Sequence, residues 1–157
     1  MNYQIDKVDH DILMILIQNS RTPFTEIGQK LLISAGTVHV RYNKMEEAGI
    51  IKSSTLVLDY EKMGFTFTGY IGVSLAESAK VIDVLEDMRK IPEITVASFT
   101  TGQFGIFCKI RCRDTVHARD IITMILSNKG VRKTDTMVCL EERINGKNRL
   151  IKSVFNT

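Results

Sequence analysis

The 157-residue sequence predicts an α+β chain of two domains, with helices alone in the first and strands mixed with helices in the second. Up to Ala48, apolar residues recur at the three- to four-residue spacing of amphipathic helices. From Phe65 onward they alternate with polar residues, as in strands that have one buried face. We therefore predict that residues 1–50 form one domain, 51–64 a linker strand or wing, and 65–157 the second domain.

The composition is typical of a globular protein, with 44% hydrophobic and 25% charged residues. The apolar run from Ile12 to Ile17 is far too short to cross a bilayer, and the polar N-terminus does not resemble a secretory signal. Cys108, Cys112 and Cys139 cannot all pair with one another. We expect reduced thiols and a cytoplasmic protein without a membrane partner.

Two helices are predicted before residue 32. The first begins at Asp6, which can cap it, and ends at Asn19-Ser20. The second is predicted to begin with Thr22 as its cap and Pro23 at its first position, where a missing N–H leaves nothing unsatisfied. It runs to about Leu31.

A third helix is predicted only two or three residues later, from the cap residue Ser34 to Ala48, with Gly49 as its stop. Two amphipathic helices joined by so tight a turn indicate a helix-turn-helix, whose second helix enters the major groove of DNA. Residues 50–58 are β-like and suit the wing of a winged variant.

The solvent side of this third helix carries groups that suit double-stranded DNA. Hydroxyls and backbone N–H groups at the helix start can hold a phosphate, cations can neutralise phosphates, and polar side chains can reach base edges. The candidate residues are Ser34, Thr37, His39, Val40, Arg41, Asn43 and Lys44. The alternative is an ordinary solvated helix face. Net charge does not decide between them, because the first 58 residues carry six basic and six acidic residues.

The second domain has the order strand-helix-strand-strand-helix-strand, which is the ferredoxin-like βαββαβ arrangement. We predict a strand over 67–75, a helix capped by Ser78, strands over 94–101 and 104–112, a helix capped by Asp114 and stopped by Gly130, and a last strand from Arg132 or Lys133 to Leu140. Gly102-Gln103 is predicted as a two-residue hairpin turn. The second helix is predicted to turn Val116, Ile121, Ile122, Ile125 and Leu126 inward.

Helices cover only one face of such a sheet. An open face that bears Phe107 or Tyr70 needs a partner, which indicates a homodimer. Gly69 and Gly72 lie inside the first strand and indicate close packing there. The tail from residue 141 is predicted to add an edge strand at 149–151.

At this point the residues resemble the Lrp/AsnC family of transcriptional regulators, over essentially the whole chain. The resemblance rests on Ile5-Asp6-x-x-Asp9-x-x-Ile12-Leu13, Ser34-x-x-Thr37-Val38-x-x-Arg41, Met45-Glu46-x-x-Gly49-Ile50-Ile51, Thr101-Gly102-x-Phe104 and Thr134-Asp135-Thr136. The stretches Thr37-Val38-His39-Val40-Arg41 and Thr100-Thr101-Gly102 look most like the asparagine-responsive branch.

The resemblance implies a DNA-binding regulator whose assembly or DNA affinity responds to an amino acid, with asparagine as the first candidate. It implies dimers that associate further, into octamers or other assemblies. It places the effector near the Gly102 hairpin at an interface between dimers. The candidate effector contacts are Thr101, Gly102, Gln103, Thr134, Asp135 and Thr136.

The chain departs from the family pattern at two positions. Many members have an acidic residue where this chain has Gly105, so a role in holding the effector's ammonium passes to Asp135 as the nearest substitute. The helix-turn-helix turn usually contains Gly where this chain has Leu32, and a left-handed Leu costs roughly 1–2 kcal/mol.

Other classes of site are poorly supported. Cys108, Cys112, Cys139 and His117 lack the tight spacing of zinc ligands, and buried cysteines behave as small hydrophobes, so we expect no metal and no cofactor. No nucleophile elbow, P-loop, dinucleotide fingerprint or metalloprotease motif is present. The alternative function is a small ferredoxin-like enzyme whose helical N-terminus serves assembly, since that fold also hosts enzymes.

Overall fold

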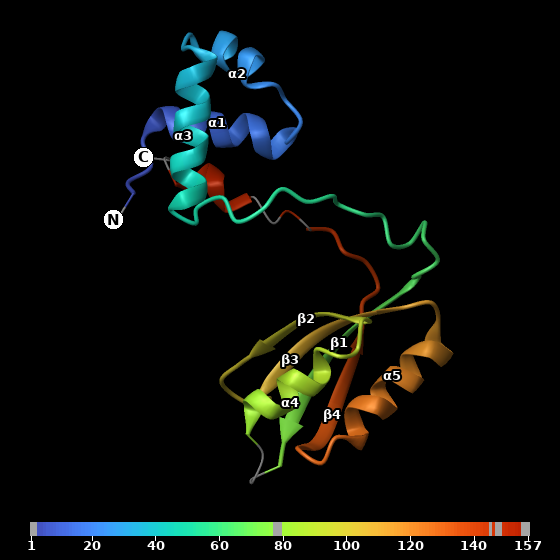
Figure 1. Cartoon of the computed structure of the whole chain (residues 1–157). Coiled ribbons are helices and arrows are strands. Elements are labelled where there is room, and N and C mark those ends of the chain that lie inside the picture. Colours follow the sequence, from blue (N-terminus) through green and yellow to red (C-terminus); the bar gives the residue numbers. More distant parts are fainter. Residues whose placement is uncertain (1–2, 77–79, 145, 147–148, 155–157) are drawn as a thin grey trace. The chain divides into compact units, whose positions relative to one another are not determined.

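The computed structural model describes residues 3–76, 80–144, 146 and 149–154. It divides into two compact units (Figure 1). Unit 1 consists of residues 1–57 together with 144–157, and unit 2 of residues 58–143. The tail thus groups with the N-terminal helices, whereas the sequence assigned it to the second domain.

Unit 1 contains the three predicted helices: α1 (Lys7–Gln18), α2 (Phe24–Leu31) and α3 (Ala35–Glu47). Asp6 caps α1 as predicted, and Ser34 caps α3 by accepting a hydrogen bond from the Thr37 N–H at 3.0 Å. The prediction for α2 was wrong by one residue. Pro23 is the N-cap, and the Thr22 hydroxyl instead donates to the Asn19 carbonyl at 2.8 Å, which closes the preceding turn.

The turn between α2 and α3 contains the strained residue that the sequence indicated. Leu32 is left-handed, with φ 56° and ψ 39°. Its side chain is 93% exposed, so packing does not offset the strain. The turn stays tight because Gly28 lies beneath it: a Cβ there would be 2.7 Å from the Ile33 carbonyl oxygen.

The predicted wing strand and tail strand are both wrong. Residues 50–66 are all described and contain no strand. In the tail, Arg149–Ser153 form a 3-10 helix, η1, in place of an edge strand. Ile151 packs against the core of unit 1, which contains Ile12, Ile27, Val38 and Met45. The tail therefore adds an apolar contact to the helices, where the sequence pattern alone suggested strand pairing.

Unit 2 is built on a four-stranded antiparallel sheet of order β2-β3-β1-β4, the ferredoxin-like arrangement that the sequence predicted. The strands are β1 (Phe67–Leu75), β2 (Ile94–Phe99), β3 (Ile106–Cys112) and β4 (Val131–Val138). β2 ends two residues earlier than predicted and β3 begins two later, so the hairpin loop is 100–105, longer than two residues. β4 is also shifted toward the N-terminus, since Leu140 is 96% exposed beyond its end.

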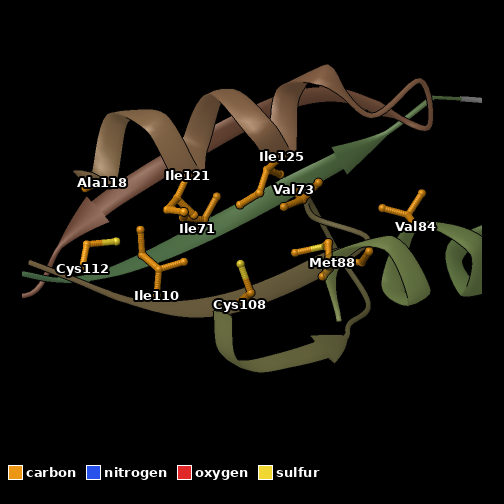
Figure 2. Close-up of a cluster of buried hydrophobic side chains, with 11 residues drawn as sticks. Ile71, Val73, Val84, Met88, Cys108, Ile110, Cys112, Ala118, Ile121 and Ile125 are labelled. Carbon is orange, nitrogen blue, oxygen red and sulfur yellow. The ribbon is translucent and has the colours of Figure 1, made fainter. Parts of the chain in front are cut away.

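Helices α4 (Val81–Met88) and α5 (Thr115–Ser127) cover one face of this sheet (Figure 2). The core between the layers includes Ile71, Val73, Ile110, Ile121 and Ile125. Asp114 caps α5 as predicted. The predicted cap of α4, Ser78, lies outside the described residues.

Two of the residues predicted to face inward from α5 do not. Val116 and Leu126 are exposed, because they lie away from the helix side that carries Ile121 and Ile125. Cys108 and Cys112 are buried in the core, where burial raises the pKa of each thiol to about 11. They act as small apolar side chains.

We predict that Leu32→Gly stabilises the protein. Glycine removes the left-handed strain of roughly 1–2 kcal/mol. Its greater conformational freedom in the unfolded chain opposes this gain and destabilises the folded protein by about 0.5–1 kcal/mol. The net gain is about 0–1.5 kcal/mol, with a central value of about 0.75 kcal/mol, measured from urea unfolding followed by circular dichroism. Gly28→Ala is the matched control and should destabilise by about 1–3 kcal/mol, because its methyl group meets backbone. If Leu32→Gly unfolds at a lower urea concentration than the wild type, the backbone at Leu32 is not strained.

Candidate functional site

A hollow of about 500 Å³ lies along the N-terminal half of α3. Its lining combines hydroxyls, two basic side chains, one apolar side chain and a glycine: Tyr3, Ser34, Gly36, Thr37, Val40, Arg41 and Lys44. Val40 is 52% exposed, although most valines are inside proteins. An exposed valine surrounded by hydroxyl and ammonium groups suits a surface that meets both phosphates and thymine methyl groups.

The predicted DNA-binding residues share one side of α3. At 100° per residue, Thr37, Val40 and Lys44 all point away from the buried Val38. His39 and Asn43 continue this surface toward α2. They are hydrogen-bonded to each other at 3.4 Å, and the His39 ring lies 5.8 Å from that of Phe24 in an edge arrangement. The packing of α2 against α3 thus orients His39 at the border of the surface.

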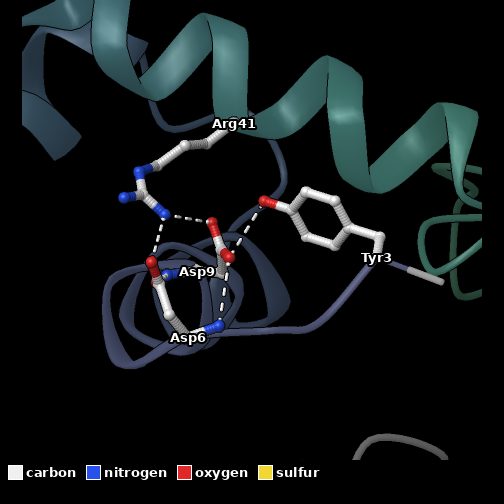
Figure 3. Close-up of polar contacts among 4 residues, drawn as sticks. All are labelled: Tyr3, Asp6, Asp9 and Arg41. Atoms are coloured by element: carbon white, nitrogen blue, oxygen red, sulfur yellow. Dashed lines mark hydrogen bonds and ion pairs between the residues drawn. The ribbon is translucent and has the colours of Figure 1, made fainter. Parts of the chain in front are cut away.

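Arg41 differs from the other predicted residues. Its Nη1 donates to Asp6 Oδ2 at 2.7 Å and to Asp9 Oδ1 at 2.8 Å (Figure 3). The hydrogen bond to Asp9, followed by that to Asp6, raises the pKa of Arg41. The guanidinium therefore links α3 to the start of α1, although the sequence indicated a phosphate ligand.

Sequence reasoning missed this network around Arg41. Asp9 was named as part of the family motif, yet its side chain is only 1% exposed. Its position three residues before the buried Ile12, on the same side of α1, is the signal that was available. A carboxylate on an apolar stripe needs a buried partner.

In unit 2 the predicted effector residues lie at one end of the sheet. The loop 100–105 closes on itself, with the Thr100 hydroxyl donating to the Phe104 carbonyl at 2.9 Å. Thr101, Gly102 and Gln103 are exposed, and Gly102 has φ +97° with open space where a Cβ would lie. Only a glycine adopts that conformation without strain.

The β4 residues do not all face the same way. Asp135 is paired with Gly72 of β1, on the open face of the sheet, and Thr134 and Thr136 point to the opposite face. Asp135 forms an ion pair with Lys133 at 2.9 Å. The hairpin and β4 flank the same stretch of β1, because Gly105 N donates to the Val73 carbonyl while Val73 pairs with Thr134 on its other side.

Two glycines shape this end of the sheet. A Cβ on Gly72 would lie 2.5 Å from the Phe104 ring, so Gly72 admits that ring onto the open face. A Cβ on Gly105 would lie 2.8 Å from Leu75 Cδ1. The Leu75 side chain therefore lies where a side chain at position 105 would begin, and it would have to move if that position carried an acidic residue.

The open face also carries a polar cluster that no sequence signal indicated. Glu142 follows β4 and accepts hydrogen bonds from Lys109, from Arg111 at 3.0 Å and from the Tyr70 hydroxyl at 3.1 Å. The bond from Lys109 is the main cause of a lowered pKa of Glu142. Tyr60 lies over the Arg111 guanidinium at 5.3 Å. Tyr60, near the start of unit 2, and Glu142, near its end, thus both contact side chains of β3.

Within the described ranges, no three His, Cys, Asp or Glu side chains are grouped as a metal site would require. The three cysteines are free, and Cys108 and Cys112 belong to the core. In the same residues, no helix is both long and apolar enough to cross a membrane.

The combination of a helix-turn-helix unit and a ferredoxin-like unit defines a class of two-domain DNA-binding regulators. A family profile described as winged helix-turn-helix DNA-binding matches residues 5–52, and one described as the Lrp/AsnC ligand binding domain matches residues 68–148. The regulatory protein AsnC of Escherichia coli K12 is 32% identical over 148 residues, covering 91% of this chain and 95% of that protein. A helix-turn-helix regulator of Pyrococcus furiosus is 33% identical over 138 residues, covering 88% and 93%.

Solved structures agree with these matches. The structure of E. coli AsnC superposes with a TM-score of 0.87 at 30% identity, covering 91% of this chain and 97% of that one. A Neisseria meningitidis transcriptional regulator, solved as its L-Met complex, superposes with a TM-score of 0.83 at 26% identity, covering 92% and 95%.

The chain belongs to the Lrp/AsnC family. It is a helix-turn-helix transcriptional regulator, and the alternative of a small ferredoxin-like enzyme is wrong, because the family consists of DNA-binding regulators.

Proposed function

We propose that this regulator binds a pseudo-palindromic DNA site through α3 and responds to an amino acid bound at the hairpin end of unit 2. The exposed side of α3 carries the DNA part of the proposal. Ser34 and Thr37 face phosphates at the helix start, Lys44 neutralises a phosphate, and Val40, His39 and Asn43 meet base edges. Arg41 is left out of this set, because two carboxylates already hold it.

The charge distribution supports the same assignment. Residues 1–57 carry six basic and six acidic residues, whereas residues 144–157 contain three basic residues and no acidic one. Because the tail groups with the helices, unit 1 carries the whole net charge of +3, and unit 2 is formally neutral. The positive excess thus lies on the unit that carries α3, as expected of a protein that binds a polyanion in the cytoplasm.

For the effector, we propose a small amino acid, with asparagine as the first candidate. Backbone N–H groups around Gly102 suit a carboxylate, and Thr101 offers a hydroxyl. Thr134 and Thr136 point to the face opposite Asp135, so they are left out of the proposed site. Asp135 already holds the ammonium group of Lys133, so it has the chemistry needed for the α-ammonium of a ligand. Gln103 offers an amide for a polar side chain. The L-Met complex of the Neisseria relative supports an amino acid as the class of ligand.

The open face of the sheet supports assembly into a homodimer. Val96 and Met137 are 53% and 45% exposed there, beside the stacked rings of Tyr70 and Phe107. A second copy that covers this face would bury them. We further propose that dimers associate through their hairpin ends into an octamer, so that a neighbouring dimer completes the effector site.

We predict that Lys44→Ala weakens DNA binding and flattens its salt dependence. Removing one phosphate contact should reduce the slope of log K against log salt by about 0.9. Fluorescence anisotropy with operator fragments at several salt concentrations measures both quantities. Lys30→Ala is the control, because Lys30 lies on α2 and pairs with Glu26 at 2.7 Å. An unchanged slope for Lys44→Ala would remove Lys44 from the interface.

We predict that Met137→Glu dissociates the dimer, because it places a charge on the face that a second copy would cover. Analytical ultracentrifugation or light scattering gives the mass. Leu126→Glu is the matched control: Leu126 is also 45% exposed, but it lies on the helical layer, so the dimer should persist. A wild-type monomer at micromolar concentration would contradict the proposed dimer.

We predict that Asp135→Ala abolishes the amino-acid response while the protein still folds and binds DNA. Loss of a charge-assisted hydrogen bond to the ammonium, about 1.5–3 kcal/mol, lowers affinity roughly ten- to hundredfold. Isothermal calorimetry with each of the twenty amino acids measures this, and Asp120→Ala on α5 serves as control. If no amino acid binds, or Asp135→Ala binds as wild type, this effector site is wrong.

A further inference from the structure

We propose that Asp9 is a positioning residue for the DNA-binding helix: acting through Arg41, it fixes how α3 is presented to DNA without touching DNA itself. The inference rests on the proposed DNA binding by α3 and assigns a role to two residues that the binding surface does not use.

Both carboxylate oxygens of Asp9 accept hydrogen bonds (Figure 3). Oδ1 accepts from Arg41 Nη1 at 2.8 Å, and Oδ2 accepts from the Tyr3 hydroxyl at 2.9 Å and from the Asp6 N–H at 3.2 Å. At 1% exposure, such a carboxylate requires these donors, since a buried charge without partners is strongly unfavourable. The network therefore joins the N-terminal segment, the start of α1 and the middle of α3.

The charge balance argues that Arg41 serves this network and not a phosphate. Its single positive charge faces Asp6 and Asp9, so the group as a whole carries a net negative charge. That group repels phosphates at long range. Lys44, three residues further along α3, is exposed and makes no ion pair with any described residue. The cation available to DNA on this part of the helix is therefore Lys44.

The ion pair between Asp9 and Arg41 gives the contact between α1 and α3 a fixed geometry, which apolar packing alone does not. The apolar residues between α1 and α3, among them Ile12, Val38 and Met45, are buried but give contacts without fixed direction. Charge-assisted hydrogen bonds have fixed geometry and hold a side chain in one place. Arg41 lies between Val40 and Lys44 in sequence, so fixing its guanidinium fixes the rotation of the turn that meets DNA.

The test compares Asp9→Asn, Arg41→Gln and their double variant with Lys44→Ala, by anisotropy over a series of salt concentrations. Circular dichroism first establishes a temperature at which every variant is folded. We expect Asp9→Asn and Arg41→Gln each to weaken binding about tenfold or more, with a salt slope equal to wild type. Lys44→Ala should flatten the slope by about 0.9, the value for a single phosphate.

The double variant distinguishes positioning from direct contact. Asn and Gln restore a neutral hydrogen-bonded pair and leave no uncompensated buried charge, since the carboxylate that remains, Asp6, is 51% exposed. We therefore expect the double variant to bind more tightly than either single variant. Tyr3→Phe removes one donor to Asp9 with little effect on the fold, and it should weaken binding to a smaller extent at unchanged slope. It keeps the proposal testable if Asp9→Asn does not fold.

Two outcomes would overturn the inference. A flattened slope for Arg41→Gln, with a double variant weaker than either single one, makes Arg41 a phosphate ligand. Wild-type affinity for folded Asp9→Asn and Tyr3→Phe, with only a lower melting temperature, makes the network merely structural. By contrast, absence of DNA binding by the wild-type protein at low salt would refute the proposed function itself.

Discussion

The register of β1 sets the geometry of unit 2. β1 pairs with β3 on one side and with β4 on the other, so both halves of the proposed effector site take their places from it. Ile71 and Val73 point into the core beneath α5, which leaves Tyr70 and Gly72 on the open face. A slip of one residue would exchange these faces, burying Tyr70 and exposing two core residues. The buried face therefore fixes the register, and the register brings loop 100–105 and Asp135 to either side of Gly72.

Unit 1 is held by a different balance of forces. Its apolar core is small, and a short tail segment adds to it through Ile151. In such a core the polar network of Asp9 and Arg41 supplies the directional contact between helices α1 and α3. The turn between α2 and α3 retains strain at Leu32, because the close approach over Gly28 fixes its path. Helix α3 is thus in contact with α1 through the ion pair between Arg41 and the buried Asp9, and it follows a strained turn.

The sequence predicted helices and strands well where they depend on interactions between residues close together in the chain. Asp6, Ser34 and Asp114 cap the helices they were expected to cap, because an N-cap hydrogen bond spans only three residues. The alternation in β1 predicted its buried face for the same reason. Local signals failed where a residue had two possible partners. Thr22 bonds backward to Asn19 instead of capping α2, and the β-like residues 50–58 have no strand to pair with in the single chain.

The amino-acid sequence by itself was sufficient to predict the three helices of unit 1, the order of strands and helices in unit 2, and the surface of α3 that faces solvent. Each of these follows from apolar periodicity and capping, which act between neighbours along the chain. The role of Arg41, the grouping of Glu142 with Lys109 and Arg111, and the return of the tail to unit 1 emerged only on folding. The physical reason is distance along the chain: Asp9 and Arg41 are 32 residues apart, and Lys109 and Glu142 are 33 apart. A charge on an exposed helix face and a charge in an ion pair have the same sequence pattern, and only the folded chain distinguishes them.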